Sequence, residues 1–236
     1  MLPGRDGVSC DETQVANHFA DRATKPCGAV TSGSESSAMN SPFETIYIIG
    51  FVLGSVIRAV YTRGRRSRHI LTSRYHVLDS VLLFMAGVGM IPVPIVALTT
   101  DWLSLGEYTP PPIMGWSGVI VFAVALWLLW RSHRDLGSNW SARIDVRDGQ
   151  VLVITGIYSR IRHPMYAAHW LWAIAQLFLV QNWLAGPAML FFYAPLYFSR
   201  VGQEEEVMRE HFGRDYEEYM ARTGRVLPRL GARRAD

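Results

Sequence analysis

The chain has 236 residues, of which 50% are hydrophobic and only 18% are charged, whereas about 25% of the residues in an ordinary soluble domain are charged. This composition favours an integral membrane protein and argues against a soluble enzyme or a wholly disordered chain. The formal net charge of +3 comes almost entirely from arginine, because Lys25 is the only lysine. The basic balance alone therefore does not indicate a nucleic-acid partner.

The N-terminal segment, residues 1–41, mixes Ser, Gly, Thr and Asn with scattered charges and has no apolar stretch like that of a signal peptide. We therefore expect a disordered tail there. Both cysteines of the chain, Cys10 and Cys27, lie in this tail, and their spacing does not fit a zinc site or a disulfide framework. No metal site is predicted.

Five apolar stretches follow, each near the length of about 20 residues that a helix needs to cross a hydrocarbon core. They predict an all-α integral membrane protein with about five transmembrane helices, at residues 43–60, 77–99, 113–130, 164–181 and 183–201. Prolines interrupt the second and fifth stretches, and we expect kinks there. The chain after the tail is thus divided into three N-terminal transmembrane helices, residues 42–130, and a C-terminal core, residues 131–236.

Arginines in the connecting loops predict the orientation in the membrane. Loop 61–75 contains five arginines and loop 131–163 contains six, whereas loop 101–112 has no Lys or Arg. By the positive-inside rule, the two arginine-rich loops face the cytoplasm. The N-terminus is then outside and the C-terminus is cytoplasmic.

The last two predicted spans are joined by only two residues, Gln181 and Asn182, which predicts a tight antiparallel hairpin. The chain would re-enter the cytoplasm at Arg200. Beyond this point, residues 203–222 carry apolar side chains at helical spacing between charged ones, which predicts an amphipathic cytoplasmic helix interrupted at Gly213. Such a helix could pack over the mouth of a pocket.

Two clusters of polar residues would meet at the cytoplasmic face. In GIYSRIRHPMY, residues 156–166, Pro164 fits the first position of a helix, whose backbone N–H groups attract anions. Arg162, His163 and Tyr166 would add further donors, although Arg and Tyr are also ordinary membrane anchors. The hairpin brings Arg200 and Glu204 to the same place, and a site with both charges suits a zwitterionic ligand.

Several motifs in this half of the chain share their order and spacing with a known family. They are LGSNWS (136–141), VLVITGIYSRIRHPMY (151–166), Asn182, the glutamates at 204–205, FG (212–213), Tyr216, Tyr219 and LP (227–228). Together they resemble the isoprenylcysteine carboxyl methyltransferase family, which includes bacterial members and is related to phospholipid methyltransferases. The resemblance covers about residues 134–229. It implies an S-adenosylmethionine-dependent methyltransferase in a membrane, which for a bacterial member is the inner membrane.

The resemblance also implies roles for individual residues. Glu204 would contact S-adenosylmethionine, and Arg200 would act at the carboxylate of the substrate. Gln150 would also contact the cofactor; it stands where many relatives have a histidine, and its amide can still donate and accept a hydrogen bond. The other implied cofactor contacts are Val151, Leu152, Val153, Tyr158, His163, Pro164, Met165 and Tyr166.

Attack on a sulfonium methyl group depends mainly on orientation and desolvation, so a carboxylate acceptor needs no general base. A small thiol or a lipid amine would need one, and Glu205 or His163 would be the first candidates. The sequence does not choose among these acceptors. Two other classes stay open: a nicotinamide-dependent membrane reductase, because sterol reductases share a similar helical layout, and a non-catalytic scaffold. The expected partners are a lipophilic or small-molecule methyl acceptor and membrane lipid, without nucleic acid or metal.

Overall fold

The computed structural model describes residues 41–63, 70–73, 77–137, 145–147, 149 and 151–229. The chain divides into two units, residues 1–35 and 36–236, and all of the described residues belong to the second. The predicted disordered tail lies outside the described residues except for Ser41. Gln150 and residues 138–141 of the LGSNWS motif also lie outside them.

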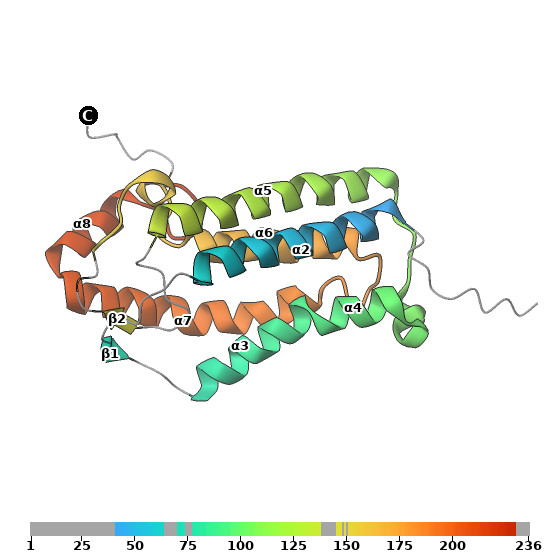
Figure 1. The fold of residues 1–236 in the computed structure, drawn as a ribbon, viewed down its shortest axis with the longest axis horizontal. Helices are drawn as coiled ribbons and strands as arrows, with labels where there is room; N and C mark the ends of the chain where they lie inside the picture. The colour runs from blue at the N-terminus through green and yellow to red at the C-terminus, as the bar shows by residue number, and fades with distance from the viewer. Residues whose placement is uncertain are drawn as a thin grey trace, which may run out of the picture. The chain divides into compact units, whose positions relative to one another are not determined.

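The second unit consists mainly of helices (Figure 1). In chain order these are α2 (Pro42–Arg63), α3 (Val77–Met90), α4 (Pro92–Thr99), the 3-10 helix η1 (Asp101–Gly106), α5 (Pro112–Leu136), the 3-10 helix η3 (Gly156–Ser159), α6 (Pro164–Leu179), α7 (Ala188–Phe212) and α8 (Arg214–Arg222).

Three helical stretches are long and apolar enough to cross a membrane: Pro42–Arg63, Val77–Thr99 and Pro112–Leu136. They coincide with the first three predicted spans. The fourth and fifth predicted spans also form helices, but α6 has only 16 residues and α7 extends well past the predicted end at residue 201. The first three spans are thus supported by length and composition, and the total of five remains a prediction.

The expectation of an all-α fold was wrong in one detail, because two short strands are present. Strand β1 (Ile70–Ser73) pairs antiparallel with β2 (Asp145–Arg147), so that Ile70 lies opposite Arg147. The pairing joins the two loops that the arginine content predicts to share one side of the membrane. Strands of three or four residues are too short for alternation of apolar and polar residues to reveal them.

The second predicted span bends where proline was expected to interrupt it. Helix α3 ends at Met90 and α4 begins at Pro92, whose ring nitrogen cannot donate to the preceding turn. The hydrogen-bonding pattern resumes at once, since the Ile95 amide donates to the Ile91 carbonyl at 3.2 Å. The predicted interruption is confirmed.

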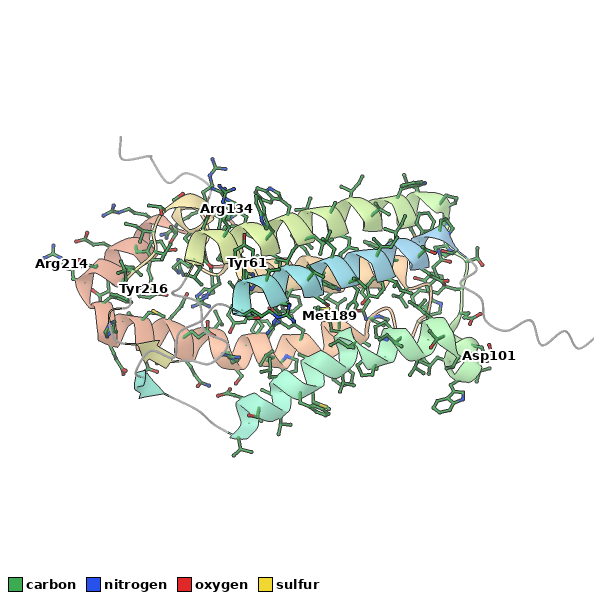
Figure 2. The ribbon with its side chains drawn as sticks, in the orientation of Figure 1. Tyr61, Asp101, Arg134, Met189, Arg214 and Tyr216 are labelled. Atoms are coloured by element: carbon green, nitrogen blue, oxygen red, sulfur yellow. The ribbon has the colours of Figure 1, made fainter. Side chains whose placement is uncertain are left out.

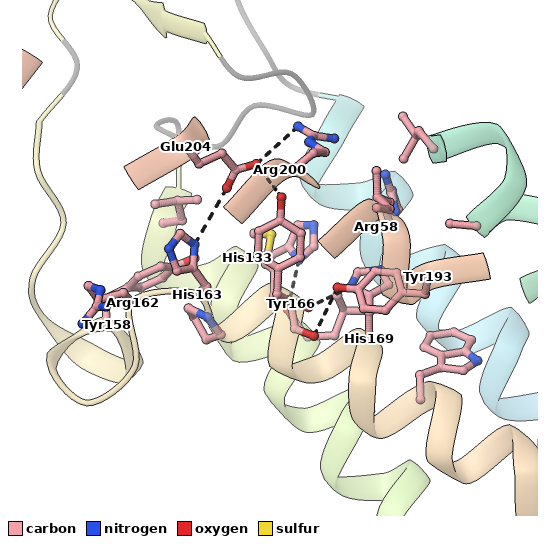
Figure 3. A pocket seen from close by; sticks show the side chains of 18 of the residues that line it. Arg58, His133, Tyr158, Arg162, His163, Tyr166, His169, Tyr193, Arg200 and Glu204 are labelled. Atoms are coloured by element: carbon pink, nitrogen blue, oxygen red, sulfur yellow. Dashed lines mark hydrogen bonds and ion pairs between the residues drawn. The ribbon is translucent and has the colours of Figure 1, made fainter. Parts of the chain in front are cut away.

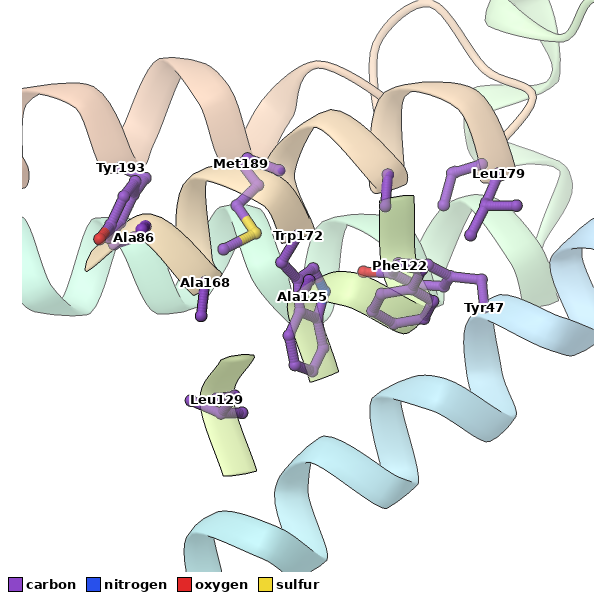
Figure 4. Packing of buried hydrophobic residues seen from close by; sticks show 14 of the residues in the cluster. Tyr47, Ala86, Phe122, Ala125, Leu129, Ala168, Trp172, Leu179, Met189 and Tyr193 are labelled. Atoms are coloured by element: carbon purple, nitrogen blue, oxygen red, sulfur yellow. The ribbon is translucent and has the colours of Figure 1, made fainter. Parts of the chain in front are cut away.

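Glycines on α2 allow this helix to approach α5 and α6 closely. Tyr47 of α2 lies against Phe122 of α5 (Figure 4). A Cβ atom at Gly50 would lie 2.2 Å from the Phe122 ring, and one at Gly54 would lie 2.5 Å from the Trp172 ring. The rings of Phe122 and Trp172 in turn meet edge to face, with centroids 5.0 Å apart. This aromatic layer forms the centre of the core.

Gln176 of α6 is a fully buried polar residue that ties several helices together. Its amide nitrogen donates to the carbonyls of Gly89 at 3.0 Å and Ala185 at 2.8 Å, and its amide oxygen accepts a hydrogen bond from the Tyr47 hydroxyl at 2.8 Å. Satisfying all of these groups away from water fixes α2, α3 and the turn before α7 around α6. Gln176 therefore has a structural role.

The connection between α6 and α7 is longer than the predicted two residues, because α7 begins only at Ala188. The buried side chain of Asn182 accepts hydrogen bonds from the Leu184 and Ala185 amides, at 2.9 and 3.0 Å, and donates to the Leu103 carbonyl at 2.7 Å. These bonds hold residues 182–187 in turns. Because most of these residues are apolar, the sequence predicted a transmembrane helix here instead. Asp101 of η1 and Arg214 of α8 lie at opposite ends of the helical unit (Figure 2).

Candidate active site

A cavity of about 540 Å³ opens between α2, α3, α5, α6, α7 and α8, with the irregular segment 151–153 along one side. Charged and hydroxyl-bearing side chains gather in one part of the lining, as Figure 3 shows for Arg200, Glu204, His163 and Tyr166. Apolar residues form much of the rest of the lining, among them Leu83, Ala86, Met90, Trp172, Met189 and Leu196. The cavity therefore offers both polar and apolar surfaces to one ligand or to two neighbouring ligands.

The start of α6 is held in place by the C-terminal segment. Helix α6 begins at Pro164, as the sequence predicts. Just before it, the Arg162 amide donates to the Gly224 carbonyl at 2.8 Å and the His163 amide donates to the Arg225 carbonyl at 2.9 Å. Residues about 60 positions apart in sequence thus run side by side at the edge of the cavity.

Glu204 is the centre of the polar part of the lining. Its Oε1 accepts a hydrogen bond from the Tyr166 hydroxyl at 2.5 Å and lies 3.3 Å from the Arg200 guanidinium. Its other oxygen lies 3.8 Å from His163 Nδ1. The Glu204 side chain is 23% exposed, so the carboxylate can still accept hydrogen bonds from a ligand.

Glu205, the next residue, points into a separate buried cluster. Its carboxylate is 2% exposed and accepts hydrogen bonds from Arg162, His163 and Arg225. Burial by itself would raise the pKa of Glu205, but the hydrogen bonds from His163 and Arg225 and the charge of Arg162 hold that pKa well below its usual value. Glu205 is not among the residues that line the cavity. A role of Glu205 as general base for a thiol or amine acceptor stays a prediction.

Helix α8 is fastened to η3 through tyrosines. The Tyr219 hydroxyl donates to the Tyr158 carbonyl at 2.7 Å. Burial raises the pKa of both Tyr158 and Tyr219, so both hydroxyls stay protonated and act as donors near neutral pH. Because Tyr158, Tyr216 and Tyr219 all line the cavity, α8 closes one side of it.

The cavity brings together the predicted site residues that the structure describes, apart from Glu205. Arg200 lines it, as do Val151, Leu152, Val153, Tyr158, His163, Pro164, Met165, Tyr166 and Glu204. Sequence reasoning missed Arg58, an arginine inside a predicted span, where a charge is itself a signal of function. It also missed Arg225, which nothing in the local sequence distinguishes from other tail arginines. Among the described residues, no group of three His, Cys, Asp or Glu is placed to hold a metal ion.

Comparison with known proteins identifies the family of the segment that contains much of this site. Residues 117–210 match the model of the isoprenylcysteine carboxyl methyltransferase (ICMT) family. This segment belongs to that family. The resemblance to this family is thereby confirmed. The family match begins further toward the N-terminus than the motifs, so that it includes most of α5, and it ends at residue 210, before FG (212–213), Tyr216, Tyr219 and LP (227–228).

Curated proteins of the same family are similar over the same region. A probable protein-S-isoprenylcysteine O-methyltransferase of Oryza sativa subsp. indica is 33% identical over 86 residues, which cover 36% of this chain and 45% of the rice protein. The corresponding enzyme of Saccharomyces cerevisiae is 36% identical over 78 residues, 33% of each protein. The human enzyme is 28% identical over 102 residues, 42% of this chain and 36% of the human one. The chain thus spans less than half the length of these ICMT-family relatives.

A solved structure shares the fold. The eukaryotic intramembrane Ras methyltransferase ICMT superposes with a TM-score of 0.50 at 19% sequence identity, over 80% of this chain and 69% of the other. This likeness covers a larger share of the chain than the segment matched by the family model. It shows that this chain and that protein share a fold.

Proposed function

We propose that the chain is an integral membrane methyltransferase that transfers a methyl group from S-adenosylmethionine to the carboxylate of a lipophilic, isoprenylcysteine-like acceptor. The observation that supports it best is a single cavity in which Arg200 and Glu204 lie at a polar part and an apolar part extends between predicted spans. The family of residues 117–210 and the names of the curated relatives support the reaction type.

The polar groups that line the cavity suit S-adenosylmethionine, which carries a carboxylate, an ammonium group and ribose hydroxyls. Glu204 is the one acidic residue among the described lining residues, and it would accept hydrogen bonds from the ammonium or ribose. His163 and the N-terminal end of α6 would face the carboxylate. A cavity of about 540 Å³ falls within the range of about 300–1,000 Å³ typical of small-molecule sites.

When bound, the cofactor would supply an electrophilic methyl group on a sulfonium. Arg200 would hold the acceptor carboxylate by charge-assisted hydrogen bonds, and the Arg200–Glu204 ion pair would keep the guanidinium in position. A carboxylate attacks without losing a proton, so the reaction needs no general base. Glu205 can therefore remain bonded to Arg162 and Arg225 during the reaction. A small thiol or lipid amine acceptor would lack this advantage.

The apolar part of the cavity would take the hydrocarbon chain of the acceptor. Ala86 and Met90 come from α3, Trp172 from α6, and Met189 and Leu196 from α7. These helices belong to predicted spans, so an acceptor could enter from the lipid while the cofactor enters from the cytoplasm. We place the protein in the bacterial inner membrane, with the N-terminus outside and the C-terminus cytoplasmic.

Calorimetry of the full chain in detergent tests the cofactor. We expect binding of S-adenosylmethionine and S-adenosylhomocysteine but not of NADPH. Binding of NADPH alone would replace the proposal with a reductase, and binding of none of the three would favour the scaffold.

Two variants then separate binding from transfer. Glu204→Gln should weaken S-adenosylmethionine binding about tenfold or more, because a charged acceptor is lost, whereas Arg200→Ala should mainly lower the rate of methyl transfer from labelled cofactor. Glu206→Gln, at an exposed neighbour outside the cavity lining, is the matched control and should leave both unchanged. Full binding and turnover in the first two variants would contradict the assignment.

A further inference from the structure

Arg225 approaches the candidate active site from outside the cavity. It belongs to the C-terminal segment that follows α8, its side chain is 47% exposed, and it is not among the residues that line the cavity. Its backbone is nevertheless held against the start of α6, because its carbonyl accepts a hydrogen bond from the His163 amide at 2.9 Å. Any influence of Arg225 on a ligand must therefore pass through another side chain.

The guanidinium of Arg225 holds both oxygens of the Glu205 carboxylate. Its Nε donates to Oε1 at 3.0 Å, and its Nη2 donates to Oε2. Arg162 also donates twice, at 3.2 and 3.1 Å, but both of its bonds to Glu205 end on Oε1. The last torsion of a glutamate side chain is broad, so a carboxylate keeps one plane where a bidentate arginine holds both of its oxygens. Arg225 therefore fixes the plane of the Glu205 carboxylate.

This carboxylate in turn holds the imidazole of His163. Nε2 of His163 lies 3.3 Å from Glu205 Oε1. Paired with two arginines, Glu205 is ionised and can only accept hydrogen bonds, so Nε2 carries a proton. The other ring nitrogen, Nδ1, lies 3.8 Å from the cavity-lining Glu204 (Figure 3). One nitrogen of His163 is thus engaged by Glu205, and the other faces the side on which a ligand would bind.

A polar group that is already held in one direction loses little freedom when a ligand binds to it. The same reasoning applies to ligands of metals and to catalytic histidines, whose second ring nitrogen is usually held by a carboxylate or a carbonyl. In this chain the sequence of contacts runs from Arg225 to Glu205 and from Glu205 to His163. Its first member lies in a segment that is otherwise remote from the cavity.

We propose that Arg225 is a positioning residue for cofactor binding: through Glu205 it fixes the imidazole of His163, which presents Nδ1 to the ligand beside Glu204. This inference rests on the proposed function, in which S-adenosylmethionine occupies the polar part of the cavity. It gives the segment beyond α8 a role in ligand affinity without direct contact.

Nuclear magnetic resonance of histidine labelled with 15N in the ring tests the step from Arg225 to His163 without any cofactor. The His163 signals are assigned by their loss in His163→Gln. They should move in Arg225→Gln, because the carboxylate that holds Nε2 is no longer fixed, and they should move less in Arg225→Lys, whose ammonium group lacks the bidentate geometry. Arg222→Gln is the matched control. The Arg222 side chain is 65% exposed and pairs with Glu218 at 3.2 Å, so its replacement should leave the signals in place.

Calorimetry of the full chain in detergent tests the step from His163 to S-adenosylmethionine. Arg225→Gln should raise Kd about tenfold, the size of one hydrogen bond, and Arg225→Lys about threefold. Arg222→Gln should leave Kd unchanged. In a protein that already carries Glu205→Gln, the addition of Arg225→Gln should weaken binding no further, because the effect of Arg225 passes through Glu205.

Unchanged His163 signals in Arg225→Gln would overturn the inference, as would a raised Kd without a change in those signals or additive losses in the double variant. If Arg225→Gln fails to fold, Arg225→Lys decides, and signals identical to those of the unaltered protein would then overturn the inference. Failure of the unaltered protein to bind S-adenosylmethionine would instead count against the proposed function, and the His163 signals would still decide whether Arg225 positions the ring.

Discussion

Consecutive glutamates on α7 have different surroundings. Glu204 faces the cavity with Tyr166 and Arg200, whereas Glu205 is buried between Arg162 and Arg225. A helix turns by about 100° per residue, so neighbouring side chains point in different directions. The glutamate pair at 204–205 is thus one cavity-lining residue followed by one residue that joins the C-terminal segment to the start of α6.

Replacement of Glu205 should destabilise the protein in a pH-dependent way. Because its pKa in the folded protein is lowered, Glu205 contributes stability above its unfolded pKa of about 4.3, and this contribution is lost as the pH falls through the folded pKa. Glu205→Gln should therefore lower Tm at pH 7, with a loss of about 3 kcal/mol for a largely buried pair.

Thermal unfolding in detergent between pH 7 and pH 3 measures this effect. The gap between Glu205→Gln and the unaltered protein should narrow below about pH 4. Glu206→Gln serves as the control, and we expect its Tm to follow that of the unaltered protein throughout. A Glu205→Gln variant with unchanged Tm at pH 7, or a gap that does not vary with pH, would exclude this role for the cluster.

At the scale of elements, the turn before α7 depends on one side chain. Asn182 is 3% exposed and satisfies two backbone amides and one backbone carbonyl. Asn182→Ala would leave these buried groups unpaired, at a cost of about 1–3 kcal/mol. We expect a correspondingly lower Tm, while Gln181→Ala, at a neighbouring position, should have little effect. Equal Tm values for the two variants would show that the turn does not require the Asn182 side chain.

Local signals predicted the elements better than their contacts. Pro164 marks the start of α6 and Gly213, with φ of 54°, marks the end of α7, as expected from the backbone preferences of these residues. The convergence of His163 and Tyr166 on Glu204 followed from the hairpin alone. In contrast, the β1–β2 pairing and the contact of Arg225 with Glu205 join segments through space. A single sequence holds no local signal for such contacts.

At the scale of the whole molecule, the orientation in the membrane stays a prediction, and fusions can test it. Because loops 61–75 and 131–163 are rich in arginine, we expect the C-terminus to be cytoplasmic. Fluorescent protein fused after residue 236 should fluoresce, and alkaline phosphatase inserted in loop 101–112 should be active.

The reciprocal fusions are the controls, and both should be silent. Active phosphatase at the C-terminus would show that the orientation is opposite to the predicted one. The polar part of the cavity would then face away from the cytoplasm, where the cofactor is found. Exchange of the arginines in loop 61–75 for glutamine should weaken the orientation preference and produce a mixed signal at both positions.

The hydrogen bonds between Glu205 and Arg225 also determine when the site can form during synthesis. These residues are 20 positions apart, which at about 5–20 residues per second is a delay of about 1–4 s. During this interval the spans have been made, but the carboxylate still lacks one of its cationic partners and His163 lacks its backbone partner at residue 225. The polar part of the cavity is therefore complete only after the last of the predicted spans has been synthesised.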